Sequence, residues 1–236
     1  MQPTLVQLVE DYRREDSRVV KVMTFGASES HFSYHSNARP TWYHWLEKTW
    51  RTQSPHIIMM NGSIGGNCVR DLWGRFDRYV TPFRPDMVFI SMGGNDANVP
   101  VPMSEFYETL TNLCKRVQAL GGTPVLQTLY TPVLHRFSEA YQRTFPDYMV
   151  MNLTVADECG VPCLDMHRWF YPAYQADPER YARELMTDDI HVNEVGNAVW
   201  GCLVAEEMGL PKPALADLEE DVDRSLAWLR SLTGKK

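Results

Sequence analysis

Three residues that could act together in acyl transfer lie near the two ends of the chain. Ser28 ends the tripeptide Gly26-Ala27-Ser28 shortly after an apolar run, and Asp188 and His191 bound the segment DDIH. A serine hydroxyl needs a base, usually a histidine that a carboxylate orients. A tight turn through DDIH would bring Asp188 to one imidazole nitrogen of His191 and leave the other for Ser28. Each residue also has a structural interpretation: Ser28 and Asp188 could cap helices, and His191 could lie in a surface loop.

Two glycine-rich segments could supply donors for the oxyanion that forms in acyl transfer. They read NGSIGG, from Asn61, and GGND, from Gly93. Small residues let backbone amides come close to a ligand, and each oxyanion donor contributes ~2.7–4 kcal/mol. We expect the side-chain amide of Asn95 and the backbone amides of Ser28 and Ser63 to be these donors, with Gly62 as the alternative to Ser63. Taken alone, each glycine cluster could be an ordinary strand-to-helix turn.

Five apolar runs that alternate with helical patterns predict a mostly parallel sheet. The runs are Val19 to Phe25, His56 to Asn61, Asp86 to Met92, Thr123 to Leu129 and Val161 to Asp165. Apolar spacing of three and four residues predicts helices over Thr41 to Thr52, Val69 to Val80, Met103 to Leu120, Arg136 to Glu158, Asn193 to Met208 and Pro213 to Leu232. Ligands of such sheets bind at the carboxyl ends of the strands, where Ser28 and both glycine-rich segments lie.

Composition limits the class of protein and its partners. The 236 residues carry a net charge of −7, with 23 basic and 30 acidic side chains, so nothing indicates binding to nucleic acid or to an anionic membrane. No segment approaches ~20 uninterrupted apolar residues. Five scattered cysteines indicate reduced thiols, and because the segment MQPTLVQLVEDYRRED has no apolar signal-peptide region, we expect a cytoplasmic protein. Because no repeat or flexible linker interrupts the pattern, we expect a single domain over residues 1–236.

The four segments together resemble the SGNH (GDSL) hydrolase superfamily, and they follow one another in its order from Gly26 to His191. The resemblance implies a three-layer α/β/α sandwich, flavodoxin-like, and ester hydrolysis without a metal or organic cofactor. It implies that Ser28 is the nucleophile, His191 the base, Asp188 its orienting acid and Asn95 an oxyanion donor. The chain differs from the family in two places. Ala27 replaces the usual aspartate, and Ser63 stands where we align the oxyanion glycine.

Three groups of aromatic and histidine residues have less specific interpretations. His31 and His35 are spaced for a metal on a helix, but without a third ligand they fit better as loop residues at the mouth of the site. Trp42, Trp45, Leu46, Thr49 and Trp50 share one helical face, which indicates core packing. An ordered loop over the site or a separate hydrophobic cluster would explain Trp169, Phe170, Tyr171 and Tyr174.

The sequence therefore predicts a serine esterase that removes short acyl groups, with acetyl the leading candidate and an acetylated sugar a candidate substrate. The acetyl and sugar assignments rest on the family resemblance. A lysophospholipase or thioesterase of the same fold is the alternative among hydrolases. A non-catalytic module that binds acylated ligands and an acyltransferase remain further alternatives. The sequence indicates no particular oligomeric state.

Overall fold

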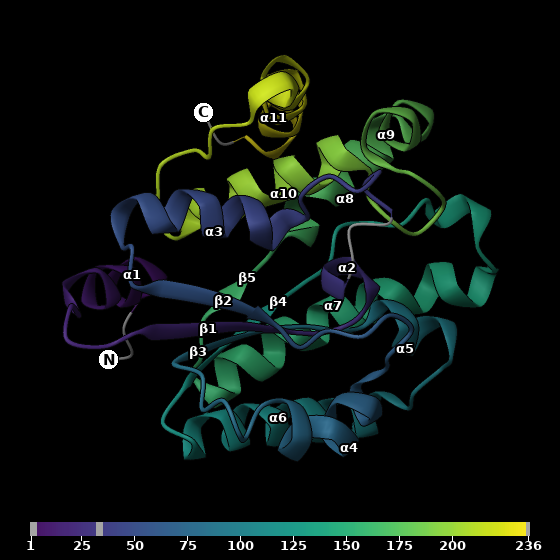
Figure 1. Ribbon diagram of the computed structural model, residues 1–236. Coiled ribbons are helices and arrows are strands. Elements are labelled where there is room, and N and C mark those ends of the chain that lie inside the picture. Colours follow the sequence, from purple (N-terminus) through teal and green to yellow (C-terminus); the bar gives the residue numbers. More distant parts are fainter. Residues whose placement is uncertain (1–3, 32–34, 235–236) are drawn as a thin grey trace.

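A five-stranded sheet forms the centre of the computed structural model, which describes residues 4–31 and 35–234 (Figure 1). Its order is β2-β1-β3-β4-β5, and every neighbouring pair is parallel. The strands are β1 (Val20–Phe25), β2 (Ile57–Asn61), β3 (Met87–Ser91), β4 (Thr123–Gln127) and β5 (Cys163–Leu164). This topology confirms the predicted flavodoxin-like sheet. All five predicted strands form, each within two residues of its expected start.

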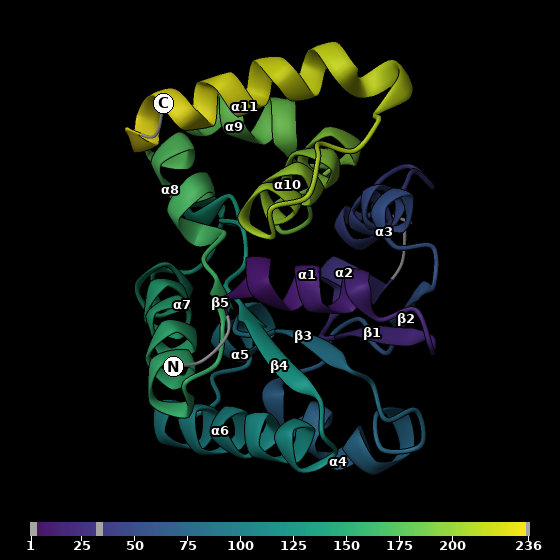
Figure 2. The same ribbon diagram turned by 90° about the vertical axis from the view of Figure 1, so that its left-hand side faces the viewer.

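Helices cover both faces of the sheet, as continuous burial of β3 requires (Figures 1 and 2). One face carries α3 (Trp42–Gln53), α8 (His167–Ala176) and α10 (Glu194–Glu207), with α9 (Pro178–Leu185) and α11 (Glu219–Thr233) outside them. The other face carries α4 (Val69–Tyr79), α5 (Gly94–Asn98), α6 (Met103–Ala119) and α7 (Glu139–Cys159). The shorter helical elements are α2 (Ser28–His31), η1 (Leu134–Arg136) and η2 (Ala216–Leu218).

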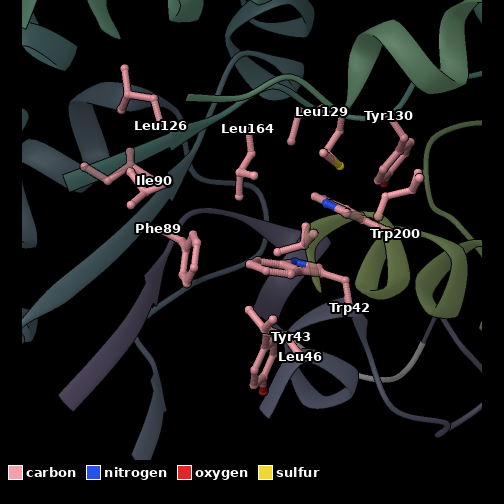
Figure 3. Close-up of a cluster of buried hydrophobic side chains, with 14 of the residues drawn as sticks. Trp42, Tyr43, Leu46, Phe89, Ile90, Leu126, Leu129, Tyr130, Leu164 and Trp200 are labelled. Carbon is pink, nitrogen blue, oxygen red and sulfur yellow. The ribbon is translucent and has the colours of Figure 1, made fainter. Parts of the chain in front are cut away.

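Aromatic packing joins α3 and α10 to the sheet. Trp42 stacks on Trp200 with ring centroids 5.3 Å apart, and it meets Phe89 of β3 edge-on at 5.6 Å (Figure 3). Tyr130, just after β4, packs its ring edge-on against Trp200 at 5.2 Å. The predicted apolar face of α3 is buried as a whole, which confirms its interpretation as core. This core continues directly to the carboxyl end of the sheet through Tyr130.

The sequence prediction differs from the structure at several places, among them the unpredicted helix α9 and the two segments described next. Residues Leu5–Arg14 form an unpredicted helix, α1, whose Tyr12 hydroxyl donates to the carbonyl of Asp86 at the amino end of the sheet. The aromatic segment, for which a loop over the site and a separate hydrophobic cluster were both left open, forms helix α8, and its Trp169 and Phe170 are buried in the main core. The loop interpretation was wrong because prolines were taken as loop signals, whereas Pro172 lies inside the helix.

Candidate active site

The residues singled out by sequence meet at the carboxyl end of the sheet. Ser28 begins α2 directly after β1. The loops after β2 and β3 lie beside it, since Asn67 and Asn95 line the same cavity as Ser28. His191 comes from the segment between α9 and α10, which Figure 1 shows on the opposite side of α2 from the sheet. Residues 163 positions apart in sequence are thus in contact.

The DDIH segment forms a tight hairpin that holds Asp188 and His191 on the same side. An isolated bridge pairs Met186 with Val192, and the amide of Thr187 donates to the carbonyl of His191. Asp188 Oδ1 accepts the backbone amides of Ile190 at 2.8 Å and His191 at 2.7 Å, which is the local turn typical of aspartate. The helix-cap interpretation of Asp188 does not hold, because Asn193 caps α10.

Ser28, His191 and Asp188 form a continuous hydrogen-bonded series. Ser28 Oγ lies 3.0 Å from His191 Nε2. On the other side of the ring, His191 Nδ1 lies 2.8 Å from Asp188 Oδ2 and 3.1 Å from Oδ1. An ionised carboxylate can only accept hydrogen bonds, so Nδ1 carries the proton and Nε2 accepts the Ser28 hydroxyl. This tautomer is the one in which histidine can act as a base toward serine.

The hydrogen bonds around Asp188 keep its carboxyl ionised. Partial burial would raise its pKa, but the bonds from the His191 ring and from the amides of Ile190 and His191 outweigh burial and lower the pKa to about 2. The carboxylate is therefore negative at any pH at which the protein would work. It can stabilise the imidazolium that forms when His191 takes a proton.

Neighbouring segments hold the hairpin in place. The Tyr130 hydroxyl donates to the carbonyl of Ile190 at 2.7 Å, and the amide of Val133 donates to the carbonyl of Asp189 at 2.8 Å. Arg136 Nη1 bonds the Asp189 carboxylate at 2.9 Å. The segment after β4 thus fixes both residues between Asp188 and His191, so the position of His191 depends on tertiary contacts as well as on its own turn.

The side chain of Asn95 has a donor available beside Ser28. Its Nδ2 donates to the backbone carbonyl of Asn67 at 2.9 Å, which fixes the plane of the amide. An amide nitrogen carries two hydrogens, so one remains for a ligand. The amide of Ser28 is the first of α2 and has no carbonyl from an earlier turn of that helix. Both expected donors therefore lie at the cavity with at least one hydrogen to give.

Ser63 has a different environment from the one expected. Its amide donates to Asn61 Oδ1 at 2.9 Å, and its hydroxyl oxygen accepts the amide of Gly26 at 3.0 Å. The alternative, Gly62, donates its amide to the carbonyl of Thr24 at 2.8 Å. This geometry favours a structural role for Ser63, which ties the loop after β2 to the loop after β1.

Gly66 is a candidate donor in this loop that the sequence analysis did not single out. Its φ of +81° is in the left-handed region that glycine favours, and within the described part of the chain its amide has no acceptor. The preceding glycine, Gly65, lies against the nucleophile turn, since a Cβ added there would be 3.7 Å from Ser28 Cβ. The sequence signal that could have identified Gly66 is the pair of consecutive glycines. The left-handed backbone conformation of Gly66 costs glycine little, whereas it would strain a residue with a Cβ, such as Ser63.

His35 stacks on the candidate base, whereas His31 does not reach it. The His35 and His191 rings are 3.5 Å apart and within 5° of parallel, and His35 Nδ1 lies 3.6 Å from Asp188 Oδ2. Burial and the nearby His191 lower the pKa of His35. The three side chains could offer ligand atoms within 4.8 Å of one another. However, lone pairs in parallel ring planes do not converge on one ion, so metal binding would require a ring to rotate. His31 Nδ1 instead accepts the amide of Gly65.

Glu29 brings a buried carboxylate to the nucleophile turn, where the family's aspartate is replaced by Ala27. Its Oε1 accepts the amide of Ala27 at 2.8 Å. Burial raises the pKa of Glu29 to about 7, although hydrogen bonds from the backbone and from Ser30 oppose the shift. The sequence analysis did not single out this residue, because a lone glutamate at the start of a helix is ordinarily exposed.

The fold and the polar series at its carboxyl edge define a flavodoxin-like α/β protein with a serine, a histidine and an aspartate at the candidate site. The profile of the GDSL-like Lipase/Acylhydrolase family matches residues 7–199. The chain belongs to this family, and it is accordingly a hydrolase of carboxylic esters. No curated protein sequence matches it significantly.

Solved structures share the fold at low sequence identity. An acetylxylan esterase from Geobacillus stearothermophilus is 20% identical with a TM-score of 0.69, covering 84% of this chain and 97% of its own. A mutant described as an acetyl-xylooligosaccharide esterase from the same organism has a TM-score of 0.70 at 20% identity and the same coverage. An alpha/beta hydrolase from the metagenome of Lake Arreo, Spain, is 23% identical with a TM-score of 0.67, covering 81% and 96%. These likenesses establish the shared fold.

Two further findings concern redox state and membranes. The five cysteines are free thiols, as the sequence predicted. Among the described residues, no helix combines the length and the apolar character needed to cross a bilayer.

Proposed function

We propose that this chain is a serine esterase that removes short acyl groups, acetyl above all, from oxygen esters. The observation that carries the proposal is the hydrogen-bonded order of Ser28, His191 and Asp188 at the carboxyl edge of the sheet. A cytoplasmic location is part of the proposal and is supported by the free thiols.

In the proposed reaction, Ser28 Oγ bonds to the acyl carbon while its proton moves to His191 Nε2. The oxyanion accepts hydrogen bonds from Asn95 Nδ2 and from the amides of Ser28 and Gly66, with Gly66 in place of Ser63. As the ester C–O bond breaks, the leaving alcohol takes the proton from His191. Water then attacks the acyl-enzyme and gives a proton to His191, which returns it to Ser28 as the free acid leaves. No cofactor is required in this scheme.

The size of the cavity beside Ser28 supports a small acyl group. Its volume is about 20 Å³, and it is bounded on the apolar side by Leu129, Tyr130, Pro132 and Ile190. On this measure a single water needs roughly 10–15 Å³, so the space beside Ser28 holds a group of about methyl size. This observation favours acetyl esters over the substrates of a lysophospholipase.

Acetylated carbohydrate is the substrate class we propose. The protein is acidic overall, which suits a neutral substrate better than an anionic one. Among proteins of the same fold, the Geobacillus enzyme is described as an acetylxylan esterase. Structures described as its catalytic mutants carry alanine in place of a serine, an aspartate or a histidine, the three residue types proposed for this chain.

A p-nitrophenyl ester series from acetate to octanoate tests the proposal on wild type and Ser28→Ala. We expect the highest kcat/KM on acetate and a loss of roughly 10⁴-fold or more in the variant, whose folding should be intact by circular dichroism. Acetylated xylooligosaccharides are the next substrates, with acetate release as the readout. Near-wild-type activity in Ser28→Ala would contradict the mechanism. A preference for octanoate would contradict the acetyl assignment, and an inactive wild type would favour a binding module.

A further inference from the structure

Arg75, in the middle of α4, contacts the loop after β1, which carries Ser28, and the glycine-rich loop after β2. Its Nη2 donates to the carbonyl of Gly26 at 3.0 Å, and its Nη1 donates to the carbonyl of Gly62. Its Nε donates to the side-chain oxygen of Asn67 at 2.7 Å. One planar guanidinium therefore joins the loop after β1 to the loop after β2 at three acceptors.

Two aromatic rings pack near the guanidinium. Its Cζ lies 4.4 Å from the ring centroid of Phe25 and 5.1 Å from that of Tyr79. Burial lowers the pKa of Arg75, but an arginine remains charged at physiological pH. Among the described residues, no carboxylate lies within ion-pair distance of it. The charge is thus directed at backbone and amide oxygens, which suits positioning better than pairing with an acid.

On the nucleophile side, Arg75 and Glu29 fix one peptide unit at both ends. The carbonyl of Gly26 accepts from Arg75, while the amide of the following residue, Ala27, donates to Glu29 Oε1. Because a peptide unit is planar, holding its oxygen and its hydrogen fixes its orientation. The next peptide unit carries the amide of Ser28, a proposed oxyanion donor. Arg75 thereby helps to fix the backbone orientation at Ser28.

On the other side, Arg75 reaches Asn95 through one residue. The Asn67 side chain accepts from Arg75, and the Asn67 backbone carbonyl accepts from Asn95 Nδ2. Asn67 also closes the turn that contains Gly66, because its amide donates to the carbonyl of Ile64 at 3.3 Å. All three proposed oxyanion donors are therefore held by groups that Arg75 contacts.

We propose that Arg75 is a positioning residue that holds the oxyanion donors from three separate loops in one geometry. The inference rests on the proposed function, since it concerns the same oxyanion site. Arg75 does not touch the substrate, and it acts through Gly26, Gly62 and Asn67. Its effect should appear in the transition state, when the oxyanion forms, and not in the binding of the uncharged ester.

The variant Arg75→Lys tests the proposal because lysine keeps the charge but donates from a single atom, which cannot span three acceptors. Arg78→Lys is the matched control, since Arg78 lies on the same helix and is exposed. Two readouts are needed: kcat and KM on p-nitrophenyl acetate, and the rate of covalent labelling by a fluorophosphonate probe. In labelling, Ser28 Oγ bonds to phosphorus, fluoride leaves, and the serine proton passes to His191.

We expect Arg75→Lys to lower kcat and the labelling rate by about 10–100-fold, with KM within twofold of wild type. Arg78→Lys should stay within twofold of wild type in every readout. A loss in Arg75→Lys no greater than in the control would overturn the proposal. So would a rise in KM at unchanged kcat.

A double-mutant cycle with Asn95→Ala separates positioning from a general loss of structure. If Arg75 acts partly through Asn95, Arg75→Lys should cost at least threefold less in the Asn95→Ala background. If Arg75→Lys lowered kcat by the same factor in the wild-type and Asn95→Ala backgrounds, the proposed action of Arg75 through Asn95 would be overturned.

If Arg75→Lys unfolds below the assay temperature, Asn67→Ala is the second variant, because it removes one acceptor while leaving Arg75 in place. We expect it to lower kcat and the labelling rate with KM unchanged, as for Arg75→Lys. A wild type that is labelled at Ser28 but hydrolyses no ester would contradict the proposed function alone, because the labelling rates still test Arg75.

Discussion

Asp188 performs two separable tasks at the residue scale. Its Oδ1 closes the hairpin by accepting two backbone amides, and the same carboxylate accepts the proton-bearing nitrogen of His191. An asparagine could still accept the amides through its oxygen, but it would lack the charge that stabilises the imidazolium. Substitution can therefore remove the electrostatic task while keeping the turn.

We predict that Asp188→Asn loses roughly 10³–10⁴-fold in kcat on p-nitrophenyl acetate, with little change in stability. Asp188→Ala should lose a similar factor in kcat and also lower the melting temperature, because two backbone amides lose their acceptor. Steady-state kinetics and thermal unfolding of both variants check this. Activity of Asp188→Asn within tenfold of wild type would show that the charge is not needed.

Glu29 makes stability depend on pH. Its pKa is raised to about 7 in the folded protein, above the value near 4.5 expected when unfolded. Between these values the folded chain holds a proton that the unfolded chain has released, so the free energy of unfolding falls as pH rises. Above about pH 7 Glu29 is ionised in both states, so the free energy of unfolding does not fall further on its account.

We therefore predict that Glu29→Gln flattens the decline in stability between pH 5 and pH 8 by on the order of 3 kcal/mol. The substituted glutamine would keep an oxygen to accept the amide of Ala27. Urea unfolding of wild type and variant at both pH values measures the difference. Parallel pH dependences in the two proteins would mean that Glu29 is already ionised in the folded state.

At the element scale, the contact between α3 and α10 depends on Gly201. A Cβ added there would lie 2.7 Å from Trp45 Cβ and 2.9 Å from the carbonyl of Trp42. Both neighbours belong to the helix that supports the aromatic core, and one of them is backbone, so neither can move cheaply. The same core holds Tyr130, which fixes the hairpin that carries His191.

We predict that Gly201→Ala destabilises the protein by about 1–3 kcal/mol through overpacking. The matched control is Gly74→Ala on α4, where nothing lies within 4 Å of an added Cβ. Because alanine favours helix, Gly74→Ala should stabilise by about 0.5–1 kcal/mol. Denaturant unfolding of both variants measures the two effects, and a neutral or stabilising Gly201→Ala would show that α3 and α10 can separate without cost.

At the scale of the whole molecule, we propose that the chain is one domain that extends beyond the family match. Helix α11 lies after residue 199, the end of that match, and packs against α8 and α10. Its Val222, Leu226 and Leu229 are buried. The helix therefore shares the core of the sheet layer and does not form a core of its own.

A single domain predicts one cooperative unfolding transition. In a Trp228→Phe variant, which removes the tryptophan of α11, fluorescence reports on the remaining tryptophans, Trp42 and Trp200 of the core among them, and far-ultraviolet circular dichroism reports on all helices. We expect the two thermal transitions to coincide, because α11 cannot unfold without exposing α10. A separate early transition in circular dichroism alone would show that α11 is an independent unit.

The sequence by itself determined the sheet, most helices and the residues of the candidate series. Buried runs of apolar residues and helical spacing are local signals, and DDIH brings Asp188 and His191 together within one turn. The order of the four motifs was sufficient to indicate the family. Short-range chemistry can be read from the chain because it involves neighbours in sequence.

Only the tertiary structure decided which groups support that series. Ser63, chosen by alignment, donates its amide to Asn61, whereas Gly66 keeps its amide available. Neither Glu29 nor Arg75 was identified from a sequence motif, yet folding places both at the nucleophile turn. Their roles depend on which backbone groups remain without partners once the loops pack together. That outcome is set by contacts between distant segments, so no local pattern in the sequence encodes the positions of Glu29 and Arg75.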